Sequence, residues 1–449
     1  MLRRSQAIMP KNNNKEKDLK YKKPTRIGRF FRILGPGLIT GAADDDPSGI
    51  ATYSQTGAQF GFGQLWASFY QLPLLIAIQE TCARIGAVTG QGLAGVVKDN
   101  FSKKVLGFVV FLVVIANTIN IGADIGAMAS AAELVWDLPF AFYAIFFAAL
   151  IVCLEVFVSY KRYVKFLKWL AIVLVAYIFT ALIIDHSWSE ILRATFVPHI
   201  QFNFEYLFII TGVFGTTITP YMFFWQASEE VEEEIANHNL AQKGGKPRGV
   251  KKFLYNMRID TTVGMIWAQI GQWFIIITTA SVLFKNGITD ITSAADAARA
   301  LEPLVQSFPN SGQIAKDIFA IGIIGLGLLG IPVLAGSAAY ALSEAMGWKE
   351  GLYRKFSQAK GFYAVIILAT LVGLLINFIG VNPFKALVFT AVFNGIAAVP
   401  LLFVIARING NKKILGEYRG NKLSRSLVWF TFVLMAASAI GLFYTLFNK

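Results

Sequence analysis

Three consecutive aspartates lie in the middle of an apolar stretch near the start of the chain. Asp44, Asp45 and Asp46 are followed directly by Pro47-Ser48-Gly49. A carboxylate at bilayer depth costs about 2.5–3.5 kcal/mol on insertion scales, so three in a row need a cation or water. Proline removes a backbone hydrogen bond and disfavours α geometry in the residue before it, which leaves carbonyl oxygens free. Asp46 and these carbonyls therefore offer hard oxygen ligands to a cation.

A second break of the same kind lies in the other half of the chain. Residues 215–221, Gly-Thr-Thr-Ile-Thr-Pro-Tyr, place Pro220 in the middle of another apolar run. Free backbone groups at membrane depth are tolerated only where buried protein or a watery cavity satisfies them. If both prolines were simple kinks, the aspartate triplet would have no explanation. We therefore predict one cation site built from two interrupted helices.

The composition indicates the kind of protein that carries these breaks. Of 449 residues, 55% are hydrophobic and 15% are charged, and the mean hydropathy is +0.55. A soluble domain has about a quarter charged residues and under half apolar ones, so a soluble enzyme and a nucleic-acid-binding domain are disfavoured. Cys82 and Cys153 both lie in apolar stretches. Neither a disulfide framework nor a Cys-rich zinc site is therefore available.

Apolar runs of about 20 residues, the length that spans a bilayer, recur along the chain. We predict eleven spans, at 33–61, 64–88, 105–135, 139–158, 163–184, 205–236, 254–284, 314–345, 361–380, 385–407 and 425–447. The interrupted first and sixth spans lie five helices apart, and an odd offset inverts the second unit relative to the first. We expect an all-α polytopic membrane protein made of two inverted five-helix repeats plus an eleventh helix.

The basic residues predict the orientation of these spans. The segment 1–32 is polar and basic and lacks the apolar core of a signal peptide. With the N-terminus inside, only six of the 41 basic residues fall on the outer side: Arg193, Lys285, Arg299, Lys316, Lys385 and Lys449. This bias predicts a plasma-membrane protein with a cytoplasmic N-terminus and an extracytoplasmic C-terminus. It also explains most of the net charge of +14 without a nucleic acid, although basic loops of this kind also suit anionic lipid.

The expected organisation follows from the spans and their orientation. It consists of a basic cytoplasmic tail (1–32), a first five-helix repeat (33–184), an outer loop (185–204), a second, inverted repeat (205–407), a cytoplasmic loop (408–424) and the eleventh helix (425–449).

Two stretches in the first two spans are long and specific. Gly35-Pro36-Gly37, residues 46–52 and residues 55–58 form the first, and residues 79–90 (Gln-Glu-Thr-Cys-Ala-Arg-Ile-Gly-Ala-Val-Thr-Gly) form the second. They resemble the first helix of the NRAMP divalent-metal transporter family, with its signature Asp-Pro-Gly-Asn, and the end of its second helix. Weaker similarity runs to about Pro400. The resemblance implies a leucine-transporter-type fold with the ion site at the interrupted first and sixth helices.

The chain departs from the family at the site itself. The Asn of the family signature is Gly49 here, the family's Met-Pro-His reads Thr219-Pro220-Tyr221, and a second family His is Gln226. A thioether selects soft or borderline transition metals, so its loss removes that selection. Mg²⁺ prefers oxygen ligands and keeps several of its waters. The pattern resembles the NRAMP-related magnesium transporters and predicts these metal-site residues: Asp46, Gly49, Thr216, Thr219, Asp124, Gln226 and Tyr221.

The third span bears on proton coupling. The family places acidic residues there along its proton route, and the corresponding positions read Asn117, Asp124 and Ala127. No histidine lies in any predicted span, so groups that titrate near neutral pH are scarce. We predict cation movement without proton coupling. Asp124 is expected to contact waters of the cation across from Asp46, or else to act as a structural helix cap.

Other polar features have two readings each. Asp44 and Asp45 either line a vestibule or pair with a buried Arg such as Arg84, while Glu80 and Arg84 are spaced to pair with each other. The acidic run 229–234 is either a solvated helix end or an intracellular cation site or exit funnel. Asn394 either faces the cavity or bonds another helix. The glycines of residues 322–336 indicate close helix packing.

The function expected from these residues is transport by alternating access of partly hydrated Mg²⁺, with Mn²⁺ as a second substrate. We expect no enzymatic activity and no cofactor, and a monomer with the divalent ion and the lipid bilayer as its partners. The alternative is a proton-coupled Mn²⁺ or Fe²⁺ importer of the main NRAMP type. Amino-acid transport is disfavoured by the triple Asp, and an intramembrane protease using Asp46 and Asp124 would leave the second break unexplained. A channel is the remaining alternative.

Overall fold

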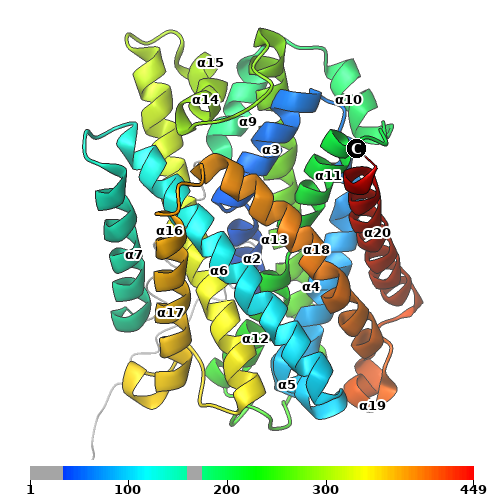
Figure 1. The fold of residues 1–449 in the computed structure, drawn as a ribbon. Helices are drawn as coiled ribbons and strands as arrows, with labels where there is room; N and C mark the ends of the chain where they lie inside the picture. Colours follow the sequence, from blue (N-terminus) through cyan, green and yellow to red (C-terminus); the bar gives the residue numbers. More distant parts are fainter. Residues whose placement is uncertain (1–33, 159–173, 449) are drawn as a thin grey trace, which may run out of the picture.

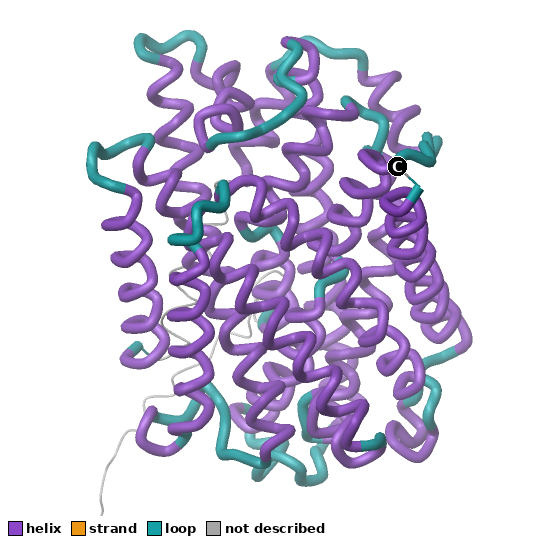
Figure 2. Tube along the Cα trace, viewed as in Figure 1, coloured by secondary structure: helices purple, strands orange, loops and turns teal. Residues whose placement is uncertain are grey.

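The computed structural model describes residues 34–158 and 174–448. The predicted tail 1–32 and the first part of the predicted fifth span lie outside the described residues. The described chain is helical and contains no strand (Figure 2). Eight of its helical segments are long and apolar enough to cross a membrane, which makes the chain a multi-pass membrane protein.

The helices follow the predicted spans closely. The first half contains α2 (Pro36–Asp44), α3 (Pro47–Phe60), α4 (Trp66–Thr89), α5 (Leu93–Asn100), α6 (Lys103–Glu133), α7 (Phe140–Phe157), α9 (Leu174–Ile183) and α10 (Trp188–Phe196). The second half contains α11 (Phe204–Thr217), α12 (Pro220–Ala236), α13 (Val250–Val282), α14 (Ala294–Ala298), α15 (Glu302–Val305), α16 (Ser311–Met346), α17 (Lys360–Ile376), α18 (Pro383–Asn409), α19 (Lys412–Leu415) and α20 (Lys422–Phe447). The predicted outer loop 185–204 contains α10, a short helix that the apolar pattern did not reveal.

Both predicted helix breaks are confirmed. The α2 helix ends at Asp44, and Asp46 is extended (φ −62°, ψ 174°) before Pro47 starts α3. The α11 helix ends at Thr217, and Thr219 is extended (φ −101°, ψ 143°) before Pro220 starts α12. In each case the residue before proline leaves the α region and the proline takes the first helical turn, where its missing N–H is harmless.

The helices form two groups with the broken helices at their interface. The α13 helix packs against α2, α3 and α4, and α12 packs against α4, while α6 packs against α16, α17 and α7. The α12 helix also contacts α16, and α18 contacts α11, α3 and α6. Figure 1 shows α10, α14 and α15 at one end, here the upper end, and α5 and α19 at the other, the lower end. The two helix breaks lie between these two ends.

The start of α2 is held by a carboxylate from α13. Asp260 accepts hydrogen bonds from the backbone N–H groups of Gly35 (2.8 Å), Gly37 (2.7 Å) and Leu38 (3.1 Å). These are donors that a helix N-terminus leaves without intrahelical partners. The Gly-Pro-Gly stretch also allows close contact, because a Cβ atom at Gly37 would lie 2.5 Å from the backbone nitrogen of Thr261. The lower half of the first broken helix, α2, is therefore held at its start by α13 (Figure 1).

Candidate functional site

Asp46 is anchored by one of its two carboxylate oxygens. Its Oδ1 accepts hydrogen bonds from the backbone N–H of Gly49 and from the Ser48 hydroxyl, both at 2.8 Å. Asp46 is thus the N-cap of α3, the position at which Asp and Ser are strongly preferred. The local sequence Asp-Pro-Ser-Gly therefore fixes the carboxylate at the break and leaves its second oxygen for other partners.

The second oxygen of Asp46 faces α6 and α12. Its Oδ2 accepts from Asn120 Nδ2 at 3.2 Å and from the Tyr221 hydroxyl at 3.3 Å. The Tyr221 hydroxyl also approaches the carbonyl oxygen of Ala43 at 3.0 Å, so its single proton is shared between two acceptors. Both contacts to Oδ2 are long for hydrogen bonds to a carboxylate. Oδ2 is therefore the oxygen that a cation can reach with the least disruption.

Asp124 lies on the other side of the same amide. Asn120 Nδ2 donates to Asp124 Oδ2 at 3.2 Å, the same distance as to Asp46. Asp124 Oδ1 has no hydrogen-bond partner within the described chain. The first and third predicted spans thus bring two carboxylates around one NH₂ group, and Asp46, Asn120 and Asp124 are each at most 1% exposed.

The second break supplies hydroxyl groups. Thr216 Oγ1 lies 3.4 Å from the Ser48 hydroxyl, and the buried Thr219 hydroxyl has no partner among the described residues. Gly49 leaves little room for a side chain, because an added Cβ would lie 3.0 Å from the Asp44 carbonyl oxygen and 3.5 Å from Thr216 Oγ1. Oxygen atoms from both broken helices therefore converge near Asp46.

Gln226 lies farther along α12 and has other partners. Its Oε1 accepts from the Thr40 hydroxyl at 2.5 Å, and its Nε2 donates to Glu230 Oε1 at 2.7 Å. In this structure the amide links α12 to α2 below the break, and no hydrogen bond joins it to Asp46.

Asp44 and Asp45 are buried, and none of their four carboxylate oxygens has a hydrogen-bond partner within the described residues. The reading that pairs them with Arg84 is wrong. Arg84 forms an ion pair with Glu80 at 2.8 Å, as the i,i+4 spacing predicts, and donates to Asn409 at 3.1 Å. Together with Asp46 these aspartates make the first break a strongly acidic region, which attracts cations.

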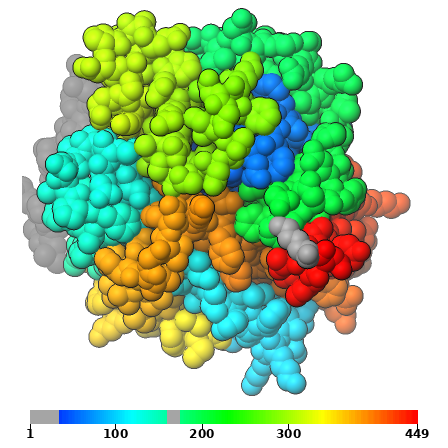
Figure 3. Space-filling model, turned by 45° about the horizontal axis from the view of Figure 1, so that its top comes forward, coloured from blue at the N-terminus to red at the C-terminus, as the bar shows by residue number. Residues whose placement is uncertain are grey.

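A cavity of about 610 Å³ opens at the upper end and stops short of Asp46. It is lined by α3, α6, α11 and α18, with Gln55 and Ala123 among its residues and Glu205 and Asp290 also on its wall. Gln55 Oε1 accepts from the Ile291 N–H at 2.9 Å, and its Nε2 donates to the Thr289 carbonyl at 3.0 Å. These bonds hold the loop after α13 against α3. Figure 3 looks toward this end, where the orange start of α18 lies between the green and turquoise segments.

Comparison with known proteins identifies the family. The model of the Nramp family, described as natural resistance-associated macrophage protein-like, matches residues 37–445. The chain belongs to the NRAMP family. It is 26% identical over 415 residues to a divalent metal cation transporter MntH of Caldanaerobacter subterraneus, covering 89% of each chain. It is 25% identical over 432 residues to MntH of Listeria monocytogenes, covering 93% of this chain and 91% of the relative.

Solved structures confirm the fold of this NRAMP chain. A manganese transporter of Eremococcus coleocola, solved with an aromatic bis-isothiourea substituted compound, matches with a TM-score of 0.74 at 14% identity, covering 94% of this chain and 88% of the other. The nucleobase-cation-symport-1 transporter Mhp1 in a closed conformation matches with a TM-score of 0.58 at 12% identity, covering 92% and 93%. The predicted leucine-transporter-type fold, with two inverted five-helix repeats, an eleventh helix and interrupted helices 1 and 6, is confirmed.

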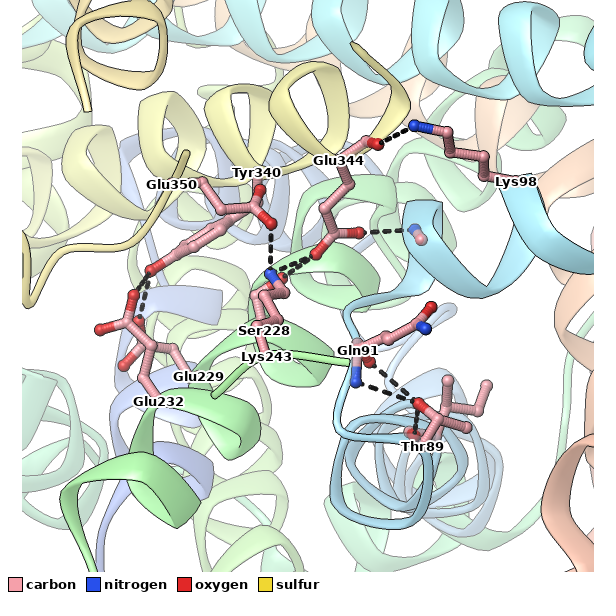
Figure 4. A network of polar contacts seen from close by, with 12 residues as sticks. Thr89, Gln91, Lys98, Ser228, Glu229, Glu232, Lys243, Tyr340, Glu344 and Glu350 are labelled. Carbon is pink, nitrogen blue, oxygen red and sulfur yellow. Dashed lines mark hydrogen bonds and ion pairs between the residues drawn. The ribbon is translucent and has the colours of Figure 1, made fainter. Parts of the chain in front are cut away.

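At the lower end of this NRAMP protein, a polar network joins α12 to α16 (Figure 4). Lys243 Nζ lies 2.6 Å from Glu344 Oε1 and 2.7 Å from Glu350 Oε1. Glu344 also accepts from the Gly95 N–H at 2.8 Å and from the Ser228 hydroxyl at 3.3 Å. Burial lowers the pKa of Lys243, but the two carboxylates raise it more, so the pKa lies above its usual value. The ammonium group therefore stays charged.

A second part of this network is centred on Tyr340. Its hydroxyl donates to Glu232 and lies 3.4 Å from Glu229 Oε1. The view of the run 229–234 as a solvated helix end is wrong for much of it, because Glu229, Glu230 and Glu234 are buried. The lower end is thus closed in this structure by ion pairs and hydrogen bonds between α12, α16 and the loop 237–249.

Asn120 and Ser48 are site residues that the sequence patterns did not predict. For Ser48 the available signal was its position, because a Ser two residues after an N-cap Asp is well placed to bond it. Asn120 precedes Asp124 by four residues, which puts both on one face of α6. That spacing was the available signal for Asn120.

Proposed function

We propose that this NRAMP-family chain transports Mg²⁺, with Mn²⁺ as a second substrate, by alternating access and without proton coupling. The observation that carries the proposal is the set of oxygen ligands around the two breaks. It consists of the carboxylates of Asp46 and, from α6, Asp124, and the hydroxyls of Thr216, Thr219 and Tyr221. Hard cations such as Mg²⁺ prefer oxygen ligands of this type. The printed names of the relatives, a divalent metal cation transporter and a manganese transporter, support a divalent ion as substrate.

The ion is proposed to bind partly hydrated. Asp46 Oδ2 has only long protein contacts, Asp124 Oδ1 has no hydrogen-bond partner among the described residues, and Gly49 contributes only its backbone. Mg²⁺ releases its waters reluctantly and is usually held by one or two carboxylates. Gln226 bonds Thr40 and Glu230 in this structure, so it is proposed to bind the cation only at a later stage of the transport cycle.

The absence of proton coupling is proposed from α6. Asn117 donates to the Leu334 carbonyl at 2.9 Å and to Ser337 at 3.3 Å, so this position is occupied by a neutral amide in a structural role. The rival function, a proton-coupled Mn²⁺ or Fe²⁺ importer, is favoured by the buried carboxylates of Asp44 and Asp45, which have no partner in the described chain. The two functions differ in whether protons accompany the metal.

We also propose an orientation and a transport unit. Exposed lysines of α19, Lys412 and Lys413, lie at the lower end, so the positive-inside rule directs this end and the N-terminus to the cytoplasm of a plasma membrane. A single chain contains every residue of the site, which supports a monomer as the transport unit.

The test is uptake of Mg²⁺ and Mn²⁺ into liposomes with the internal pH recorded at the same time. We expect saturable uptake of both ions, no pH change, and loss of uptake in Asp46→Ala but not in the control Asp317→Ala, whose target is a half-buried residue near the start of α16 that bonds Gln313. Normal transport by Asp46→Ala would overturn the site, and metal-driven pH change would favour the rival. Thr219→Met is expected to add Cd²⁺ transport if a thioether is what the site lacks.

A further inference from the structure

Asn120 occupies the space between the two carboxylates of the site. It lies on α6, it is fully buried, and its Nδ2 donates to Asp46 Oδ2 and to Asp124 Oδ2, each at 3.2 Å. Carboxylates accept hydrogen bonds and an amide NH₂ has two protons to donate, so these partners fix which way the amide points. The NH₂ group therefore takes the place between two anionic oxygens that a cation would take.

The carbonyl oxygen of the same Asn120 amide has only a weak hydrogen bond. Asn120 Oδ1 accepts from Asn394 Nδ2 of α18 at 3.4 Å, which is long for a hydrogen bond. Asn394 Oδ1 is buried and has no partner within the described residues. An unmet buried acceptor carries a cost of about 1–3 kcal/mol. The Asn120–Asn394 pair thus leaves the buried oxygen of Asn394 unsatisfied.

A half-turn of the Asn120 amide exchanges the positions of its oxygen and its NH₂ group. Rotation about the Cβ–Cγ bond directs Oδ1 toward Asp46 and Asp124 and directs Nδ2 toward Asn394. A matching half-turn of the Asn394 amide then presents its unpartnered Oδ1 as the acceptor, in place of the Nδ2 that now faces Asn120. Without a cation this state is unfavourable, because a carbonyl oxygen would face two carboxylates and two hydrogen bonds would be lost. With a divalent cation between the carboxylates, the turned oxygen faces positive charge, either directly or through a bound water.

We propose that Asn120 is a cation-binding residue whose amide substitutes for the cation in the empty site and turns to offer its oxygen when the cation arrives, with Asn394 accepting the displaced NH₂ group. The inference rests on the proposed function, since it takes Asp46 as the ligand of a transported divalent cation. It adds a neutral ligand from α6 and a partner from α18 to a site otherwise built from the two breaks.

The proposal explains how an empty site with two adjacent buried carboxylates remains compact. Uncompensated buried charges are strongly unfavourable, and the two N–H groups of Asn120 reduce that cost when no cation is bound. An alternating-access carrier must also change state while empty, so an internal substitute for the cation assists the return step.

Two substitutions at Asn120 separate this role from a merely structural one. Asn120→Leu removes both the donor and the oxygen ligand, so the KM for Mg²⁺ uptake is expected to rise about tenfold. Asn120→Asp keeps the shape and the oxygen ligand but removes the donor and adds a third carboxylate. We expect Asn120→Asp to lower the KM and also lower the maximal rate, because the cation binds better and the empty carrier returns more slowly. A residue that only supports the fold would weaken uptake in both variants.

Asn117→Leu is the matched control. Asn117 is a buried amide on the same helix that bonds Leu334 and Ser337 and touches neither carboxylate. All variants are assayed as full-length protein in liposomes, with Mg²⁺ binding to the purified monodisperse protein measured by calorimetry, so that loss of folding is separated from loss of binding.

Each outcome has a defined meaning. Opposite changes in KM for Asn120→Leu and Asn120→Asp, with an unchanged KM for Asn117→Leu, support the proposal. An unchanged KM in Asn120→Leu, or a KM raised in both Asn120 variants, overturns it. If Asp46→Ala binds and transports Mg²⁺ normally, the proposed function itself has failed, whereas loss in Asp46→Ala with no effect at Asn120 rejects only this inference.

Discussion

A side chain at Gly330 would collide with Asp46, because a Cβ atom added to this glycine of α16 would lie 2.9 Å from the Cβ of Asp46. The long helix α16 therefore sets how far the carboxylate can move sideways. The glycines of residues 322–336 were expected to allow close helix packing, and Gly330 does so at the centre of the site.

Gly330→Ala is therefore expected to displace the Asp46 carboxylate and to raise the KM for Mg²⁺ uptake by about tenfold. Overpacking by one methyl group costs about 1–3 kcal/mol, and part of that cost falls on the site geometry. The control is Gly312→Ala on the same helix, where an added Cβ meets nothing within 4 Å. Equal KM values for the two variants in the liposome assay would show that Gly330 does not position Asp46.

Lys243→Gln is expected to loosen the lower end. The ammonium group joins Glu344 and Glu350 at 2.6 and 2.7 Å, and its removal leaves two buried acidic groups without their cationic partner. The segments 237–249 and 347–359 should then exchange their backbone hydrogens at least about tenfold faster, because local opening becomes less costly. Hydrogen exchange followed by mass spectrometry measures this effect. Lys246→Gln, at an exposed lysine in the same loop, should exchange like the parent protein, and identical rates in both variants would contradict the closing role of Lys243.

Glu350 makes the stability of the lower end depend on pH. Burial, together with the charge of Glu344, raises the pKa of Glu350 from 4.5 to about 8. Because the pKa is higher in the folded state, the folded protein binds this proton more tightly, and the contribution is fully present below about pH 4.5 and lost as the pH rises through about 8. Glu350→Gln should therefore flatten the fall of the melting temperature between pH 5 and pH 8.5. A parallel fall in parent and variant would show that Glu350 is not its source.

The features that the sequence predicted well are local ones. Pro47 and Pro220 each lack a backbone N–H and restrict the residue before them, so both breaks follow from a few neighbouring residues. The Glu80–Arg84 pair likewise depends only on helical spacing. The spans follow from apolar length, and the family follows from motifs within single helices.

The features that were missed or misjudged depend on how helices are rotated against each other. Asn120 and Gln226 are both amides on apolar helices, yet Asn120 faces Asp46 while Gln226 bonds Thr40 and Glu230. The run 229–234 looks like a solvated end in sequence, but packing against α16 buries much of it. No periodicity within one helix reveals which neighbour its polar face meets.

By itself the sequence determined that this chain crosses the membrane many times, where its first and sixth spans break, and which residue types stand at those breaks. These properties depend on hydropathy, on proline and on residue type. Only the tertiary structure decided that Asn120 of α6 lies between Asp46 and Asp124 and that Lys243 joins Glu344 to Glu350. Such contacts link residues 74 and 101 positions apart, and they are set by the crossing and rotation of packed helices, which local sequence does not encode.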